Sequence, residues 1–509
     1  MDVKDIFSYD WSYLLPEFII LGFATGLSLL DLFMGKRTSR AVIGYLSIIG
    51  VLLAGYFVLN NMQTLDKPVS YMADMLRVDD FGNAFKLIFL AGVAFTFIMS
   101  LSHLKNDEVS HQGEYYYLLL AGLLGAMVMA SSADLITLFV GLELLSISSY
   151  VLVGLRKKSL RSSESAFKYV VSGGIATAVT LFGMSYVYGL SGTTNLYLIT
   201  ERLNEAYASG FSFMVLLAFA FLLVGLAFKI SAVPNHLWTP DVYQGAPTPV
   251  TAFLAVVSKA AGFAIIIRVM FIAFYRIVNP ANEPLFFTQL NWYIAVLAGL
   301  SMIIGNTMAL RQTNVKRMMA YSGVAQAGYI LVPFVTMTTF FYEQVIFYLF
   351  AYMLMGFGAF AVIMVVTTDQ KSEDIRAFAG LYHRAPLAAL AMSIFLLSLA
   401  GIPVTAGFFG KFYIFMSAVA VKSYLLSAVM IATSVVSYYY YFGIIRQMYM
   451  RPGETEAPLR LPSGVVLVVV LTAVSTVLLG INPEWAVSYI HSHFNSGFDF
   501  GNLIAPPGQ

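Results

Sequence analysis

Long apolar runs recur along the whole chain and are separated by short polar segments. Each run is close to the roughly 20 residues that a helix needs to cross a bilayer. Because a backbone in lipid must satisfy its own hydrogen bonds, these runs predict membrane-spanning helices; a barrel would show shorter alternating segments. The pattern therefore predicts an all-α polytopic membrane protein. We predict fourteen spans, at residues 13–33, 41–60, 81–102, 115–132, 134–154, 165–190, 212–233, 248–274, 291–310, 319–338, 342–367, 386–419, 423–447 and 463–482.

Lysine and arginine are distributed unevenly between the two sides that this span count defines. If the first loop is cytoplasmic, seventeen of the 29 Lys and Arg fall in cytoplasmic loops, six on the other side and six within spans. Cytoplasmic loops of membrane proteins carry such an excess. We expect a multi-pass protein of a bacterial plasma membrane, with both termini on the outer side.

Two of the spans carry helix-breaking residues. In the seventh, Lys229 is followed by PNHLWTPDVYQGAPTPV, and the twelfth contains LAGIPVTAGFFGKF from Leu399. Proline removes a helix donor and glycine relaxes the backbone, so both spans should be discontinuous. Broken helices in corresponding places are typical of inverted-repeat transporters.

The offset of five spans predicts that spans 4–8 repeat as spans 9–13. The predicted divisions are a three-helix segment at 1–114, a first repeat at 115–274, a second repeat at 275–450, and a C-terminal helix and tail at 451–509.

Composition excludes several kinds of chemistry. The chain is 59% hydrophobic and 11% charged, whereas soluble chains are roughly 45–50% apolar and about 25% charged. It has no cysteine for an iron–sulfur or thiolate zinc site, and no GxxxxGK[ST] nucleotide loop. The net charge of +2 indicates no nucleic-acid surface. We expect no cofactor, metal or nucleotide in this chain.

Ionisable side chains stand in the middle of several apolar runs: Glu143, Lys229, Lys259 and Lys411. A charge at the bilayer centre costs at least about 2.5–3.5 kcal/mol on insertion scales, so such residues usually mark an ion or proton pathway. A lysine that is short of hydration exchanges its proton more readily, and a nearby carboxylate adjusts that balance. We predict that these lysines, joined by water, form a proton wire, with Glu143 as the partner of Lys229.

Lys168 and His236 are predicted accessory groups. Lys168 lies near the end of its span, where it alternatively extends to the interface, and His236 alternatively caps the broken helix. His236 follows Lys229 by seven residues and would share its face if the helix continued to the proline.

Other polar residues have ordinary explanations. Lys86 and Arg268 lie closer to span ends and are expected at the interface, and Lys316 and Arg317 are expected to anchor a cytoplasmic loop. The run Tyr438–Tyr441 is expected to serve aromatic packing alone.

Several of these segments resemble one known family. They are FKISAVPNHLWTPDVYQGAPTPVTAFLAVVSKAAGF from Phe228, NVKRMMAYSGVAQAGYIL from Asn314, LAGIPVTAGFFGKFYIF from Leu399 and AFKYVVSGG from Ala166. The family is that of the antiporter-like membrane subunits of the proton-pumping NADH:quinone oxidoreductase, respiratory complex I. The resemblance covers essentially the whole chain.

The resemblance implies roles for the candidate residues. Glu143 is the implied acid of the fifth span and Lys229 its paired lysine, Lys259 is the central lysine, and Lys411 lies nearest the exit. Lys168 and His236 fit accessory sites. Gln326 stands where some members carry a histidine, and glutamine binds water but does not titrate. The N-type branch fits best, because M-type subunits typically have glutamate in place of Lys411 and L-type subunits a long C-terminal lateral helix.

The implied function is proton translocation driven by quinone reduction in other subunits. The implied partners are the other antiporter-like and small membrane subunits, with flavin, iron–sulfur clusters and quinone bound in those partner subunits. A subunit of a multi-subunit sodium/proton antiporter is the first alternative, although WTPDVYQGAPTPV favours complex I. A stand-alone solute carrier or a structural scaffold explains the buried charges less well.

Overall fold

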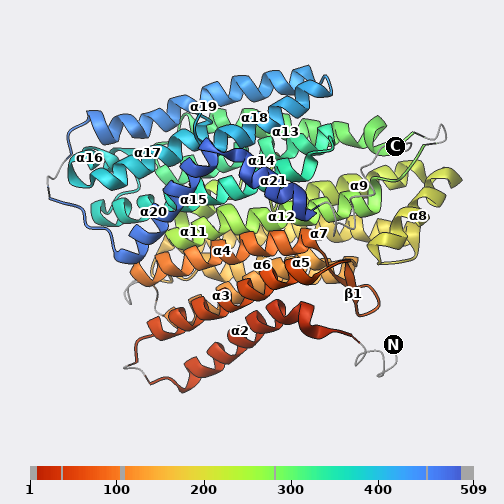
Figure 1. Ribbon diagram of the computed structural model, residues 1–509, viewed down its shortest axis with the longest axis horizontal. Helices are drawn as coiled ribbons and strands as arrows, with labels where there is room; N and C mark the ends of the chain where they lie inside the picture. Colours follow the sequence, from red (N-terminus) through yellow and green to blue (C-terminus); the bar gives the residue numbers. More distant parts are fainter. Residues whose placement is uncertain are drawn as a thin grey trace.

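The computed structural model describes residues 9–35, 38–103, 109, 111–279, 283–453 and 457–494. Within this part of the chain, thirteen helices are long and apolar enough to cross a membrane. Two shorter apolar helices, α17 (Pro386–Ala400) and α18 (Ala406–Ala420), occupy the predicted twelfth span. The prediction of a polytopic all-α membrane protein is confirmed, and the helices lie lengthwise beside one another in Figure 1.

The helix bounds follow the predicted spans closely. The spans are α2 (Leu15–Phe33), α3 (Ala41–Thr64), α4 (Asp80–His103), α5 (Gln112–Ser131), α6 (Leu135–Val153), α7 (Leu160–Ser191), α9 (Ser212–Ala227), the continuous run of α11 (Thr248–Phe253), η3 (Leu254–Ser258), α12 (Lys259–Arg268) and η4 (Val269–Phe274), then α13 (Asn291–Ala309), α14 (Val315–Thr336), α15 (Phe341–Gln370), α17 with α18, α19 (Tyr424–Met450) and α20 (Ser463–Ile481).

Short elements not predicted from the sequence join these spans. They are η1 (Trp11–Leu14), the antiparallel hairpin β1 (Val69–Tyr71) and β2 (Leu76–Val78), α8 (Leu196–Ala206), η2 (Tyr207–Phe211), α10 (Thr239–Gly245), η5 (Phe286–Leu290), η6 (Ile375–Phe378), α16 (Leu381–Arg384) and α21 (Pro483–Phe494).

Spans 7 and 12 are both broken, as predicted. In span 7 the helix ends at Ala227, and helical structure resumes only at Thr239. In span 12 the break separates α17 from α18. Each break contains a non-glycine residue in the left-handed region, Ser231 with φ 59° and Val404 with φ 70°. This backbone is costly for L-residues and is found mainly where surrounding structure holds it in place.

The two sets of five spans share their pairwise packing. In the first set α5 packs against α6 and α12, and α7 packs against α9 and α10. In the second set α13 packs against α14 and α19, and α15 packs against α17 and α18, in the same order along the chain. Because an offset of five is odd, equivalent spans cross the bilayer in opposite directions. This packing supports the predicted inverted repeat, whose boundaries stay a prediction.

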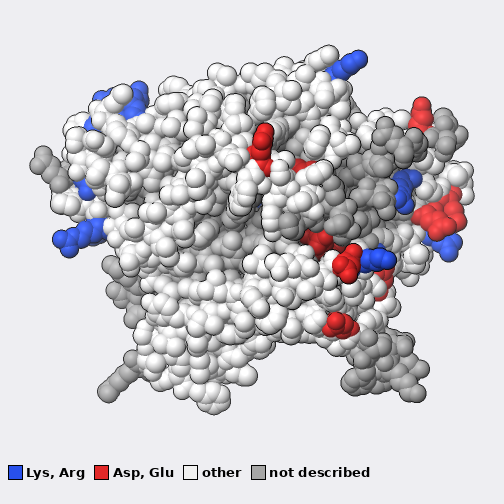
Figure 2. Space-filling view, viewed as in Figure 1, with Lys and Arg blue, Asp and Glu red and all other residues white. Residues whose placement is uncertain are grey.

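The innermost helices are the span of α11 and α12 together with α14 and α15, which are almost wholly buried. On the face drawn in Figure 2, the described residues at the left end include Lys and Arg but no Asp or Glu, while both kinds occur toward the right. The left end holds α16, between spans 11 and 12, on the side predicted to be cytoplasmic. The terminal residues, 1–8 and 495–509, lie outside the described residues, so their sidedness stays a prediction.

Glycine allows the closest helix pairs to approach. A Cβ at Gly305 of α13 would stand 2.6 Å from the Ala325 nitrogen and 2.9 Å from the Tyr321 oxygen, both on α14. In the equivalent pair, a Cβ at Gly125 of α5 would stand 2.6 Å from the Leu145 nitrogen of α6. Small residues at such crossings let membrane helices pack through their backbones.

We predict that Gly305→Val destabilises the protein by about 1–3 kcal/mol, the usual cost of overpacking. Gly299→Val on the same helix is the matched control, because no atom lies within 4 Å of a Cβ built at Gly299. The measurement is the aggregation temperature of the detergent-solubilised protein. Equal temperatures for the two variants would contradict the backbone contact.

Candidate functional site

Lys229 is buried inside the break of span 7. It is 4% exposed, and its Nζ has no hydrogen-bond partner among the described residues. Glu143 of α6 is near enough to interact electrostatically with Lys229, and its Oε1 accepts a hydrogen bond of 2.7 Å from the Thr177 hydroxyl of α7. No direct hydrogen bond joins these two described side chains. The carboxylate therefore lies within electrostatic range of the lysine without touching it, and its role as a tuning partner stays a prediction.

The break of span 7 packs against span 8 at a glycine. A Cβ at Gly262 of α12 would stand 3.0 Å from the Lys229 Cβ and 2.8 Å from the Ile230 side chain. Gly262 follows Lys259 by three residues, so the two lie on one side of α12. The absence of a side chain at Gly262 thus brings the break that carries Lys229 beside the helix that carries Lys259.

Lys259 is 1% exposed and reaches from span 8 to α14. Its Nζ donates a hydrogen bond of 2.6 Å to the Gly323 carbonyl and lies 5.6 Å from the centre of the Tyr352 ring. A Cβ at Gly323 would stand 2.9 Å from this Nζ, so glycine makes the contact possible. A π-helical turn, η3, directly precedes Lys259. Such turns are frequent at functional sites.

Lys411 extends from α18 to the end of α17. Its Nζ donates hydrogen bonds of 2.9 Å to the Leu399 carbonyl and 3.2 Å to the Ala400 carbonyl, and it lies 4.6 Å from the centre of the Tyr329 ring. The last carbonyls of a helix have no intrahelical donor and carry partial negative charge. The break in span 12 therefore supplies acceptors for a buried ammonium group.

Gln326 of α14 shares one of these acceptors. Its Nε2 donates 3.1 Å to the same Leu399 carbonyl and 3.4 Å to the Tyr441 hydroxyl, while its Oε1 accepts from the Tyr348 hydroxyl. The Tyr441 hydroxyl also lies 2.5 Å from the Ser322 Oγ. Ser322 adjoins Gly323, the partner of Lys259. Polar contacts thus run along α14 from Lys259 to Lys411.

A second group of hydroxyls continues from Lys411 along α14. The Tyr329 hydroxyl lies 3.0 Å from the Thr433 hydroxyl and accepts 3.4 Å from the Asn306 amide, whose oxygen accepts 2.9 Å from the Tyr440 hydroxyl. The expectation that Tyr438–Tyr441 serves packing alone was wrong for Tyr440 and Tyr441. The sequence does show amide and phenol groups inside α14, α15 and α19, but it does not show which partners on other helices they bind.

Lys168 and His236 lie apart from this network. Lys168 is exposed and forms ion pairs of 2.7 Å with Glu164 and 2.8 Å with Asp241. Asp241 also binds Arg317 at 2.5 Å, which ties α7, α10 and α14 together.

His236 is buried in the break of span 7, where its Nδ1 lies 3.2 Å from the Pro234 carbonyl. Because the helix ends at Ala227, the predicted shared face of Lys229 and His236 does not form.

Lys316 is buried rather than part of an open loop. It is 1% exposed, forms an ion pair of 2.9 Å with Glu373, and donates 3.2 Å to the Ala246 carbonyl. Burial acts to raise the pKa of the Glu373 carboxyl, but the Lys316 ammonium and the Asn314 amide outweigh it, so that this pKa lies below its ordinary value. The Glu373 carboxylate is therefore charged at neutral pH.

A polar cavity of about 870 Å³ opens beside this ion pair. It lies between the helices of span 8 and those of spans 10 and 11, and its lining includes Gln244, Thr248, Thr313, Lys316 and Glu373. These residues are at the ends of spans that the charge distribution assigns to the cytoplasmic side.

Two further basic residues are buried where an interfacial position was expected. Lys86 is fully buried and forms an ion pair of 2.7 Å with Glu17 of α2. Arg268 is also fully buried, pairs with Asp79 at 2.6 Å, and donates 2.5 Å to the Ala130 carbonyl. Sequence position near a span end did not reveal these partners, which lie far away in the sequence.

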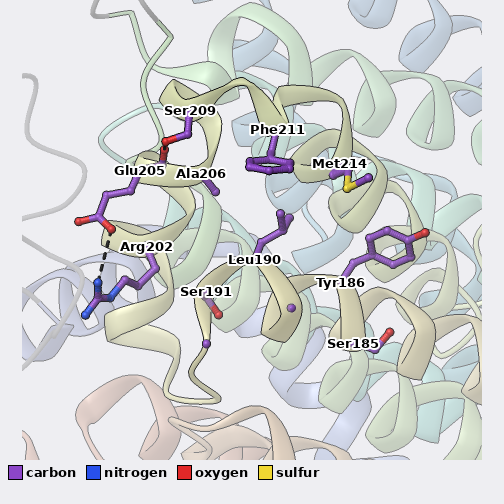
Figure 3. Close-up of a pocket in the computed structure, with 12 residues that line it drawn as sticks. Ser185, Tyr186, Leu190, Ser191, Arg202, Glu205, Ala206, Ser209, Phe211 and Met214 are labelled. Carbon is purple, nitrogen blue, oxygen red and sulfur yellow. Dashed lines mark hydrogen bonds and ion pairs between the residues drawn. The ribbon is translucent and has the colours of Figure 1, made fainter.

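Another cavity, of about 730 Å³, lies at the ends of α7, α8 and α9 (Figure 3). Tyr186, Leu190 and Phe211 line it, and Arg202 and Glu205 form an ion pair of 3.4 Å at its side. None of the buried lysines lines this cavity, so it is separate from the network. Among the described residues, no group of three His, Asp or Glu side chains could hold a metal ion.

Comparison with known proteins identifies one family. The family described as NADH:quinone oxidoreductase/Mrp antiporter, TM, matches residues 132–437, more than half of the chain. The chain is 68% identical to NADH-quinone oxidoreductase subunit N of Brevibacillus brevis over 510 residues, which is 100% of both chains.

Solved structures agree on the fold. A chain of respiratory complex I from Thermus thermophilus is 32% identical with a TM-score of 0.77, and the match covers 93% of this chain and 98% of that one. A chain of the Mrp complex from Dietzia sp. is 18% identical with a TM-score of 0.81, covering 97% and 100%. At that identity the Mrp match shows the fold alone, so the fold does not distinguish the two complexes.

Gln326→Leu is expected to destabilise the protein by about 1–3 kcal/mol, because the Tyr348 hydroxyl loses its acceptor and the Leu399 carbonyl loses one of its donors. Gln289→Leu, at an exposed position in η5, is the matched control. Thermal unfolding of the detergent-solubilised protein measures both. If Gln326→Leu unfolds no earlier than Gln289→Leu, the Gln326 hydrogen bonds contribute nothing to stability.

Proposed function

The chain belongs to the N-subunit family of NADH-quinone oxidoreductase, and we propose that in this complex it translocates protons along its buried lysines. The observation that supports the proposal best is the set of polar contacts between Lys259 and Lys411. Lys259 bonds the Gly323 carbonyl, and the adjoining Ser322 connects through Tyr441 and Gln326 to the Leu399 carbonyl, which Lys411 also bonds. Every contact in it is made by groups that are almost wholly buried. A membrane interior tolerates such groups only at a cost, which a proton pathway explains.

In this proposal protons enter through the polar cavity beside Lys316 and Glu373. Its position on the expected cytoplasmic side and its polar lining support an entry role. The proton then reaches the buried lysines, with water completing the segments between side chains. Gln326 relays through hydrogen bonds without itself changing charge, and Lys411 releases the proton toward the outer side. Lys168 and His236 would position helices around the pathway.

Glu143 is the proposed control element. With Glu143 close, Lys229 holds a proton; when the carboxylate moves away, the lysine loses that stabilisation and passes the proton on. Moving one charge against 100 mV takes about 2.3 kcal/mol, so the drive must come from outside the chain. We assign it to quinone reduction in partner subunits, which would also hold the flavin and iron–sulfur clusters.

The proposed setting is a bacterial plasma membrane with both termini on the outer side. The partners would be the other antiporter-like and small membrane subunits of the complex. The four divisions predicted from the sequence would correspond to an N-terminal three-helix segment, two functional repeats and a C-terminal helix.

Lys229→Ala and Glu143→Ala should each lower proton pumping coupled to quinone reduction at least about tenfold, a rise of about 1.4 kcal/mol in the barrier. The reason is that either change removes one half of the pair that holds and releases the proton. Pumping and quinone reduction are measured in native membranes with the complex assembled. Lys157→Ala, at an exposed position, should behave as the unchanged protein.

Two outcomes would contradict this proposal. Full pumping by Lys229→Ala would show that the buried lysine is structural. Normal quinone reduction in both variants, together with lost sodium/proton exchange, would favour a sodium/proton antiporter subunit. The chain shares the fold of such subunits.

A further inference from the structure

An apolar groove runs along the outside of the bundle between α17 and α20. Its volume is about 670 Å³ and it is lined almost entirely by aliphatic side chains. The floor is formed by the small residues Ala388, Ala391 and Ala473, each at most 8% exposed. Large side chains form the rims, with Leu387 of α17 81% exposed and Leu478 of α20 61% exposed. The groove exists because small residues form its floor and large side chains form its rims.

The groove has the length of a hydrocarbon chain in one leaflet. Its α20 wall extends from Val466 to Leu478. At 1.5 Å per residue this is roughly 18 Å, close to the roughly 15 Å of hydrocarbon in one leaflet. A chain that starts at the interface would therefore lie in the groove over the depth of its own leaflet.

One end of the groove is basic. Arg384 lines it and is 8% exposed, held in place by a 2.7 Å ion pair with Asp369 and a 2.8 Å hydrogen bond to the Ala457 carbonyl. Arg460 is exposed and lies between Leu459 and Leu461, which both line the groove. Asp369 offsets part of the charge of Arg384, and Arg460 adds a second positive charge. In Figure 2 the face over α17 and α20 is uncharged, with basic side chains at its left end.

We propose that this groove binds an anionic phospholipid of the cytoplasmic leaflet. The phosphate group would lie at Arg384 and Arg460, and one acyl chain would lie over the alanine floor. Basic pockets between membrane helices on the cytoplasmic side recognise anionic headgroups. A helix of another subunit would instead favour small residues at the exposed surface, where they allow close backbone approach; here the alanines are recessed and the exposed rims are Leu and Val. The inference is independent of the proton pathway.

The test is site-specific photo-crosslinking from Val474, an exposed groove residue, in the assembled complex in native membranes. The same photoreactive side chain at Val435 of α19, which is similarly exposed but outside the groove, is the control. Mass spectrometry of the adducts should show phospholipid at both positions, with anionic headgroups enriched at Val474 over Val435. A polypeptide adduct at Val474, or equal headgroup composition at the two positions, would overturn the proposal.

Two further variants test the charge and the shape of the groove separately. Arg460→Gln should reduce the anionic enrichment at Val474 about fivefold. This is the contribution of one basic side chain to the binding of anionic lipid at a membrane surface. Arg311→Gln, an exposed cytoplasmic arginine outside the groove, should leave it unchanged. Ala391→Phe fills the floor and should lower the total phospholipid adduct at Val474. If the adduct is unaffected by Ala391→Phe, the chain does not lie in the groove.

Discussion

The structure depends on how ammonium groups are accommodated inside an apolar bundle. A buried cation is stabilised where oxygen atoms replace its hydration, and the middle of a regular helix has no free backbone oxygens to offer. The break in span 12 solves this for Lys411, because it exposes the Leu399 and Ala400 carbonyls at the end of α17. Lys259 obtains the Gly323 carbonyl by approaching α14 closely. The buried ammonium groups therefore require the helix breaks and the glycines. The packing of the two repeats depends on both.

Glycine recurs beside each of these lysines for the same reason. Gly262 lies against Lys229, Gly323 against Lys259, and Gly401 against Lys411, where a Cβ would stand 3.0 Å from the lysine Cδ. Each missing side chain leaves room for a long aliphatic stem and its charged end. The break in span 12 also requires a glycine outside the repeat. A Cβ at Gly480 of α20 would stand 2.3 Å from the Val404 oxygen. The strained turn at Val404 is therefore held by a close neighbour.

Much of this architecture follows from the sequence. Hydrophobic runs of bilayer length predicted the spans, and proline and glycine beside Lys229 and Lys411 predicted the breaks. Both features depend on residues that are close together in the sequence. Contacts between distant spans were not accessible in the same way. Lys86 and Arg268 were expected at the interface because they stand near span ends, and their partners, Glu17 and Asp79, lie far away in the sequence. The hydroxyls of Tyr440 and Tyr441 were missed because an aromatic run has the same pattern whether its hydroxyls are bonded or not.

The charge balance of the network limits how it can operate. Lys229, Lys259 and Lys411 supply up to three positive charges, while among the described residues Glu143 is the carboxylate that interacts electrostatically with Lys229. Two like charges 10 Å apart at an effective dielectric of 20 repel by about 1.7 kcal/mol, so a proton on one lysine disfavours a proton on the next. Gln326 lies between Lys259 and Lys411 and adds no charge of its own. In the proposed pathway, a proton arriving at one lysine would therefore promote release from its neighbour, and a movement of the carboxylate at one end, driven from outside the chain, would be passed along the series.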